Sequence, residues 1–251
     1  MVLALKLILT PLLIALATLA GRRWGPGVSG WFVGLPLTSG PISFILAWQN
    51  GSPFAARAAV GTLGGIASVC LFCLAYAWLS TRLGWPAASG LAVAVFLLSA
   101  ALWNALSLPL LLTIVILAAT IAGTLALMPR RAASAAVPVT PKWDIPMRMA
   151  IATGFVLALT AASTALGPRL SGLISPFPIF GVVLAAFSHG TAGAASAARV
   201  MRGMVIGSLG FGGFFIVVAT LLGPWSVAGA YLLATAVALG INGLTLKAAQ
   251  G

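Results

Sequence analysis

Residues 51–65 read GSPFAARAAVGTLGG, and residues 193–207 read GAASAARVMRGMVIG, so three glycines and an Ala-Ala-Arg triplet recur at the same spacing 142 positions further along. Alignment at this offset also pairs Lys6 with Arg148, Gly25-Pro26 with Gly167-Pro168, and Pro36 with Pro178. An apolar chain matches itself by chance at Ala and Leu, whereas Gly, Pro and Arg mark backbone shape and charge placement. The sequence therefore predicts a duplicated module.

The composition sets the class of protein. Hydrophobic residues make up 61% of the 251 residues and charged residues only 6%, with a mean hydropathy of +1.16. A soluble domain of this size cannot bury so much apolar surface, so we predict an all-α polytopic membrane protein. The net charge of +12 would suggest nucleic acid in a soluble protein, but no nucleic-acid motif accompanies the basic residues. We expect these residues to fix the topology and to contact membrane lipids, with no nucleic-acid partner.

Apolar runs long enough to span a bilayer, at about 20 residues each, form two sets of four and one unpaired run. They predict about nine transmembrane helices, at 2–20, 29–49, 56–80, 86–104, 107–127 (unpaired), 146–166, 170–188, 198–222 and 226–246. We therefore divide the chain into repeat 1 (1–106), a linker helix with a polar cytoplasmic loop (107–145), and repeat 2 (146–251).

The unpaired run decides how the two repeats are oriented. Four helices return the chain to the side of the membrane on which it started, and the unpaired helix then crosses to the other side. Repeat 2 therefore has the inverted topology relative to repeat 1. With nine helices, ten Lys and Arg residues fall on one side, and only Lys6, Arg57 and Arg169 on the other. Because basic loops stay in the cytoplasm, we expect the N-terminus outside and the C-terminus inside.

The second helix of each repeat is interrupted by proline. Residues 34–41 read GLPLTSGP, and residues 175–181 read SPFPIFG. Proline removes a backbone donor, and the groups freed in this way must face protein or water inside a membrane. Paired breaks in inverted halves predict a substrate site at the membrane midplane. Its candidate residues are Pro36, Thr38, Ser39, Gly40, Pro41, Ser175, Pro176, Pro178 and Gly181. Ordinary packed kinks are the alternative, and full-length and re-entrant helices both remain open.

The third helices carry Gly61-x-x-x-Gly65 and Gly203-x-x-x-Gly207. Small residues at this spacing let helix backbones approach closely, so we expect the third helices to cross each other, or each to cross its own second helix. Arg57 and Arg199 begin the third helices from opposite faces of the membrane. Contact with lipid headgroups and attraction of an anionic substrate both explain these arginines, and we include them among the candidate substrate-binding residues.

The remaining polar residues carry weaker signals. His189 is either an interfacial residue or a proton-coupling group, and Asp144, the single acidic residue, is expected to cap the helix that follows it. Because no predicted span contains an acid, carboxylate proton relays are excluded.

Cys70 and Cys73 are expected to pack in the core. No phosphate-binding loop, metal-ligand cluster or nucleophile–base pair is visible, so we expect neither an enzyme nor a cofactor or metal.

The second copy resembles a family. The stretch at 170–180 reads LSGLISPFPIF and is followed by Leu184-Ala185-Ala186, Arg199 and Phe214-Phe215. In these residues the copy is similar to the small four-helix GlpM-like inner-membrane proteins. In that family a segment AGL-x-PLFPTF-x-L-x-A follows a first helix with a basic start, which is Arg148 here. In the first copy, Leu35-Pro36-Leu37 replaces the Pro-Phe-Pro core. The resemblance implies the bacterial inner membrane and a role linked to envelope polysaccharide. Small multidrug resistance and drug/metabolite transporters are analogous only, and their first-helix glutamate is missing.

Two functions follow from these observations. The first is an inverted-repeat transporter for a small anionic or amphipathic substrate, lipid-linked ones included, without carboxylate-based proton coupling. The second is a non-transporting membrane scaffold subunit that supports envelope polysaccharide or glycolipid assembly. A channel is the weakest option, because few polar residues could line a pore. The sequence leaves monomer and homodimer open.

Overall fold

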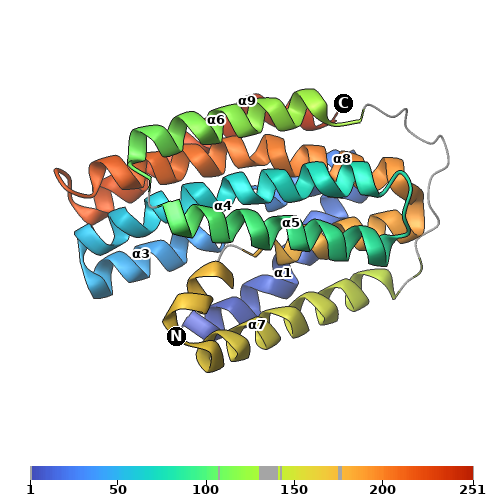
Figure 1. The fold of residues 1–251 in the computed structure, drawn as a ribbon, viewed down its shortest axis with the longest axis horizontal. Coiled ribbons are helices and arrows are strands. Elements are labelled where there is room, and N and C mark those ends of the chain that lie inside the picture. Colours follow the sequence, from blue (N-terminus) through green and yellow to red (C-terminus); the bar gives the residue numbers. More distant parts are fainter. Residues whose placement is uncertain (1, 107, 130–140, 142, 175–176, 251) are drawn as a thin grey trace.

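The computed structural model describes residues 2–106, 108–129, 141, 143–174 and 177–250, with side chains from residue 7 onward except at 161–174. These residues form helices and no strands. The helices are α1 (Val2–Trp24), α2 (Pro26–Val33), α3 (Ser39–Asn50), α4 (Ser52–Leu79), α5 (Trp85–Leu106), α6 (Leu110–Leu127), α7 (Asp144–Ile174), α8 (Ile179–Leu221) and α9 (Val227–Gln250) (Figure 1). The all-α prediction is confirmed for this part of the chain.

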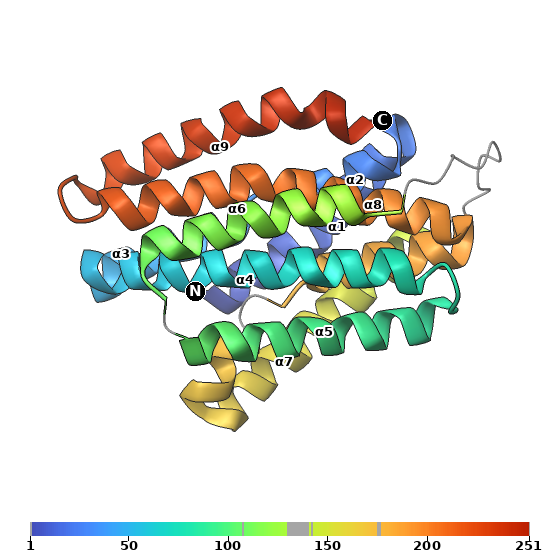
Figure 2. The same cartoon turned by 45° about the horizontal axis from the view of Figure 1, so that its top comes forward.

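Six of these helices are long and apolar enough to cross a membrane: α1, α4, α5, α6, α8 and α9. They support the prediction of a multi-pass membrane protein. The helices form an elongated bundle in which α4 and α8 are the most buried, with α9 beside α8 at one face and α5 at the opposite face (Figure 2). Large apolar side chains point outward from the other helices, as in Leu98, Leu111 and Leu244. Such a surface suits lipid rather than water.

Helix directions differ between the first and second halves of the chain. In Figure 1, α1 and α4 run from left to right, whereas α7 and the part of α8 after Gly193 run from right to left. Likewise α5 runs to the left and α9 to the right. The unpaired α6 lies between the halves in sequence and follows α5 back across the bundle.

Two glycines make the same sharp break in the backbone. Gly51, between α3 and α4, has φ 83° and ψ 162°, and Gly193, inside α8, has φ 80° and ψ 175°. A side chain strongly disfavours this region of backbone conformation, so glycine is required at both positions. The sequence alignment places these glycines at equivalent positions, and each is followed by a helix that carries Ala-Ala-Arg. The 43-residue α8 is therefore two helices, 179–192 and 194–221, joined at Gly193.

The closest helix crossing joins α2 to α8. A Cβ atom added to Gly203 would overlap the carbonyl oxygen of Gly27, and one added to Gly34 would lie 2.7 Å from the Cα of Gly207. The prediction that each glycine motif packs against its own second helix, or against the other third helix, is therefore wrong for Gly203 and Gly207. They pack against α2, because glycines at one face of that short helix expose its backbone. Gly61 is exposed, with no heavy atom within 4 Å of such a Cβ.

Candidate functional site

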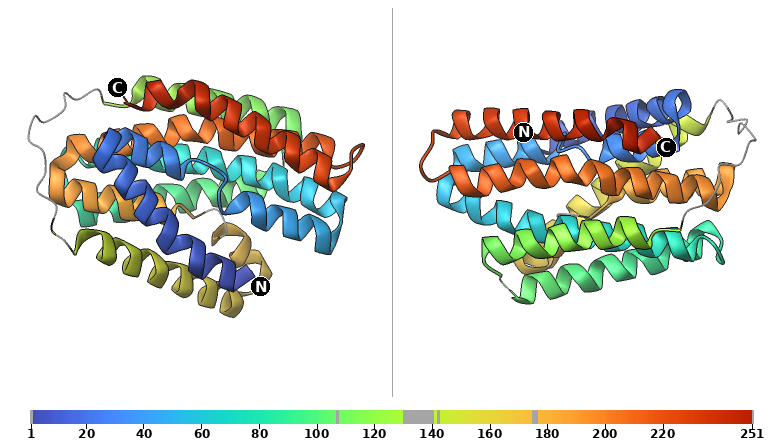
Figure 3. Two further views of the ribbon diagram at one scale, coloured as in Figure 1. Left: turned by 180° about the vertical axis from the view of Figure 1, so that it is seen from behind. Right: turned by 90° about the horizontal axis from the view of Figure 1, so that it is seen from above.

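The first helix break separates α2 from α3 and lies in the middle of the bundle (Figure 3). The carbonyl of Pro36 accepts a hydrogen bond from the amide of Gly40 at 2.8 Å, and that of Thr38 accepts one from Ile42 at 3.3 Å. These two bonds start α3 while the chain across residues 34–38 stays non-helical. Thr38 makes no side-chain capping bond, so its hydroxyl is left available beside Ser39 at the start of α3.

The second break precedes α8. The amide of Ile179 donates to the carbonyl of Phe177 at 2.9 Å across Pro178, which has φ −81° and ψ 58°. This is an inverse γ-turn, and it directs the chain into α8, where Val182 donates to the Pro178 carbonyl at 2.9 Å. The predicted site residues Ser175 and Pro176 lie outside the described residues.

Both breaks adjoin the same turn of α8. A Cβ atom on Gly34, at the end of α2, would lie 2.9 Å from the carbonyl oxygen of Met204. A Cβ atom on Gly181, just after the second break, would lie 2.7 Å from the sulfur of the same methionine. Of the predicted site residues, Gly40 also packs against α8, with the ring of Phe214 at 3.3 Å from its would-be Cβ. Residues beside the two predicted breaks therefore pack against the same part of α8, between Met204 and Phe214.

The electrostatics of this region come from the backbone. Helices α3 and α8 begin at the breaks and run to opposite ends of the bundle, so each presents an N-terminus in the middle (Figure 3). The first amides of a helix lack intrahelical acceptors, and the helix dipole places about half a positive charge there. The only acidic residue, Asp144, begins α7 at the end of the bundle. The middle therefore favours an anion or a strong hydrogen-bond acceptor.

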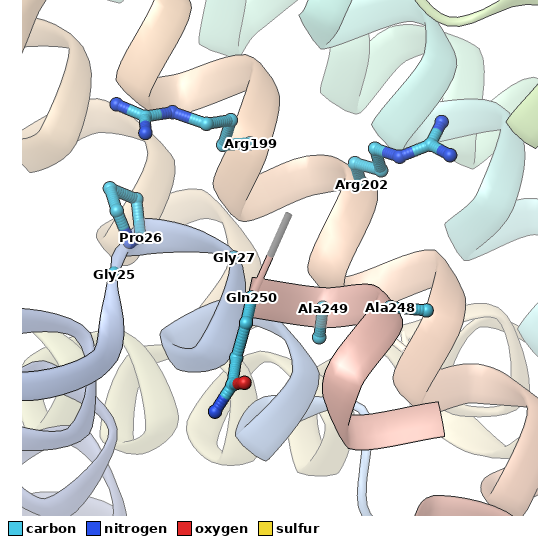
Figure 4. Close-up of a pocket in the computed structure, with 8 residues that line it drawn as sticks. All are labelled: Gly25, Pro26, Gly27, Arg199, Arg202, Ala248, Ala249 and Gln250. Carbon is cyan, nitrogen blue, oxygen red and sulfur yellow. The ribbon is translucent and has the colours of Figure 1, made fainter. Parts of the chain in front are cut away.

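Arg57 and Arg199 do not join this region. Arg57 is exposed near the start of α4, and Arg199 is half-buried near the start of the segment 194–221, at the opposite end of the bundle. Arg199 lines a cavity of about 30 Å³ together with Arg202, residues 25–27 and residues 248–250. Figure 4 shows the guanidinium of Arg199 above Pro26, whereas that of Arg202 is directed away, where its Nη1 donates to the carbonyl of Leu125 at 3.2 Å. The length of α2 separates this cavity from the first break.

Most described basic residues lie at helix ends that meet at one end of the bundle, which we call the basic end: Arg22, Arg23, Arg82, Arg148, Arg199, Arg202 and Lys247. Helix ends also contact one another here: the indole of Trp78, near the end of α4, donates to the carbonyl of Leu127, the last residue of α6, at 2.9 Å. An open hollow beside Trp78 and Arg82 also lies at this end. Neither this hollow nor the Arg199 cavity is lined by a residue of a helix break.

An ion-pair cluster at the basic end was not predicted. Asp144 is fully buried, and its carboxylate accepts hydrogen bonds from Arg22 at 2.9 Å and from the Nε of Arg148 at 3.0 and 3.1 Å. The guanidinium of Arg148 also lies 4.8 Å above the ring centre of Phe187. Asp144 is the first residue of α7, close to the expected cap, but its carboxylate pairs with arginines. The spacing of Asp144 and Arg148 was the available signal, because residues four apart meet on a helix.

Polar side chains near the first break form one buried pair. The hydroxyls of Ser43 on α3 and Tyr231 on α9 are 2.7 Å apart, and the ring of Phe44 stands edge-on to Tyr231.

His189 lies on α8 with its Nδ1 at 3.4 Å from the hydroxyl of Tyr76. Cys70 and Cys73 are free and buried, as expected for packing residues.

No protein-family model, no curated protein and no solved structure matches this chain. The resemblance to GlpM-like proteins stays a prediction.

Proposed function

We propose that this protein is an inverted-repeat membrane transporter for a small anionic or amphipathic substrate, which binds between the two helix breaks. The proposal rests on the pair of breaks at 34–38 and 177–178, which lie in corresponding parts of the two halves. Broken helices in the middle of a membrane, with half-helix termini aimed at the site, are how many secondary transporters hold a substrate.

The helix directions support an inverted repeat. In the alignment, α1 corresponds to α7, α4 to residues 194–221, and α5 to α9, and the members of each pair run in opposite directions (Figure 1). The shared backbone conformation of Gly51 and Gly193 supports the same alignment. We propose nine crossings, in which α2 and α3 together form one, and the end of α7 together with residues 179–192 forms another. Because positive charge stays inside, the basic end faces the cytoplasm and the N-terminus lies outside.

The helix termini at the breaks favour an anionic group, and the absence of acids from the predicted spans removes the usual carboxylate route for proton coupling. Transport is then passive, by exchange, or driven by the membrane potential. We place the protein in a bacterial inner membrane, without enzymatic activity.

The test is flux into proteoliposomes that contain the purified chain, screened with anionic metabolites and lipid-linked sugars. The informative variants are Pro36→Ala and Pro178→Ala, which let helix form across each break, and Ser39→Ala, which removes a hydroxyl at one of them. Gly61→Ala is the matched control, because Gly61 is exposed and has open space around it. Saturable flux that the break variants lose and the control keeps supports a carrier. Equal flux in all of them places the substrate path elsewhere.

A second candidate is a scaffold subunit for envelope polysaccharide or glycolipid assembly. It is favoured by one observation: the Arg199 cavity and the hollow beside Trp78 both lie at the basic end, away from the breaks. A well-folded protein that carries none of the candidate substrates, and whose function in cells responds only to changes on its outer surface, would favour the scaffold.

A further inference from the structure

Asn242 on α9 is a buried amide without partners. Only 1% of its surface is exposed, and neither its Nδ2 nor its Oδ1 has a hydrogen-bond partner within the described part of the chain. A Cβ atom on Gly210 of α8 would lie 2.5 Å from the Cγ of Asn242, so the amide lies directly against the backbone of α8. Buried polar groups are almost always paired, and an unpaired one calls for an explanation.

Contacts along α9 place Asn242 at the level of the first break. The indole of Trp31, near the end of α2, donates to the hydroxyl of Thr245 at 3.2 Å. On the other side of the break, Ser43 of α3 pairs with Tyr231 at 2.7 Å. The break at 34–38 therefore passes α9 between residues 231 and 245, and Asn242 lies within this interval.

Contacts along α8 give the same level independently. Gly34 packs against Gly207, and Gly40 packs against Phe214, so the break passes α8 between these two residues. Gly210, which faces Asn242, lies between them. Along both α8 and α9, the free amide therefore lies at the level of the non-helical backbone and of the N-terminus of α3.

We propose that the Asn242 amide is a substrate-binding group of this site, and that the substrate is an oxyanion that also carries a proton donor, such as hydrogen phosphate or a phosphate monoester with hydroxyl groups. The inference rests on the proposed function and names its substrate class. A carboxamide offers two donors and one acceptor. The amide nitrogen donates to an anionic oxygen, which the partial positive charge at the N-terminus of α3 also favours, and the amide oxygen accepts the proton of a P–OH or C–OH group. One ligand then satisfies both unpaired atoms.

Inorganic phosphate and sulfate test this chemistry, because they have the same shape and similar charge but only phosphate carries a proton at neutral pH. The experiment is thermal unfolding of the purified full chain in detergent, titrated with each anion at matched ionic strength. We expect phosphate to raise the melting temperature more than sulfate does. Asn242→Leu removes the unpaired amide at similar volume, so without ligand this variant should melt at the same or a higher temperature. It should bind phosphate about tenfold or more weakly, which is the effect of losing one hydrogen bond to a charged group.

Two further variants keep the test decisive. Asn242→Ala removes the amide without adding branched volume next to Gly210, and it should lose the phosphate-specific shift even if Asn242→Leu misfolds. Asn104→Leu is the matched control, because Asn104 is exposed on α5, and it should keep the shift. Equal shifts with phosphate and sulfate in the unmodified protein, or a phosphate-specific shift that survives in Asn242→Ala, would overturn the proposal.

Flux measurements separate this inference from the proposed function. Phosphate-specific stabilisation that depends on Asn242, without flux of any anion, supports the site and counts against transport. Flux that shows no preference for proton-bearing anions and is unchanged in Asn242→Ala supports transport and overturns the role of Asn242.

Discussion

Replacing Asp144 with Asn should destabilise the protein strongly, although the two side chains have nearly the same shape. The change removes the only acidic side chain and leaves Arg148, which is 5% exposed, as a buried cation beside a neutral amide. Removing one partner of a buried ion pair costs about 3–5 kcal/mol, because the remaining charge stays desolvated. Arg22 adds little to this cost, since 36% of its side chain is exposed and water can solvate it. For a chain of this length, the melting temperature should fall by on the order of 10 °C.

The assay is thermal unfolding of the detergent-purified protein, followed by tryptophan fluorescence. Two companion variants test the reasoning. Arg22→Gln should cost about 1 kcal/mol or less, because its pair is partly exposed. Adding Arg148→Met to Asp144→Asn removes both buried charges at similar volume and should recover most of the loss. An Asp144→Asn variant that melts like the unmodified protein, or a double variant no more stable than the single one, would show that an unpaired Arg148 costs little.

Three further predictions concern stability and use the same unfolding assay. Gly51→Ala and Gly193→Ala should each cost about 1–3 kcal/mol through backbone strain alone, because no crowding surrounds either glycine; a neutral result at either position would contradict its backbone conformation. Gly203→Ala should cost about 1–3 kcal/mol by forcing α2 away from α8, whereas Gly61→Ala should be neutral or stabilise by up to about 1 kcal/mol; equal effects would argue against the crossing. Tyr231→Phe should cost about 1 kcal/mol, since it leaves the buried hydroxyl of Ser43 unpaired; no loss would mean that another group replaces the phenol.

Backbone features were the most predictable part of this fold from sequence. Pro36 and Pro178 mark the breaks because proline acts on its own neighbours, whatever surrounds it. The alignment paired Gly51 with Gly193, but it did not predict the turn that both of them carry. The helix ends expected from the run 86–104 were close to those of α5, whereas the helix expected to end at 166 continues to Ile174.

Contacts between distant segments could not be predicted in this way. Gly203 and Gly207 indicate that something approaches closely, but nothing in their spacing identifies α2 as the partner. Asp144 has a local explanation as a helix cap, and its actual partner Arg22 lies 122 residues away. The location of Asn242 near the first break could not be predicted from sequence, because it follows only from how α2, α3 and α8 pack around α9. A single polar residue in an apolar helix gives no local indication of which residues surround it.

The crossing of α2 with α8 has a consequence for how the two halves depend on each other. Gly27 and Gly34 belong to the first half, and the backbone that they contact, at Gly203 and Gly207, belongs to the second. Each half therefore supplies a surface that only the other half covers, as in the subunits of an obligate dimer. Expressed as separate chains, residues 1–106 and 146–251 should be degraded singly and recovered only when they are made together. Evolution can vary one half freely only where it does not touch the other, so the tightest constraint on this duplicated chain runs between its copies rather than within them.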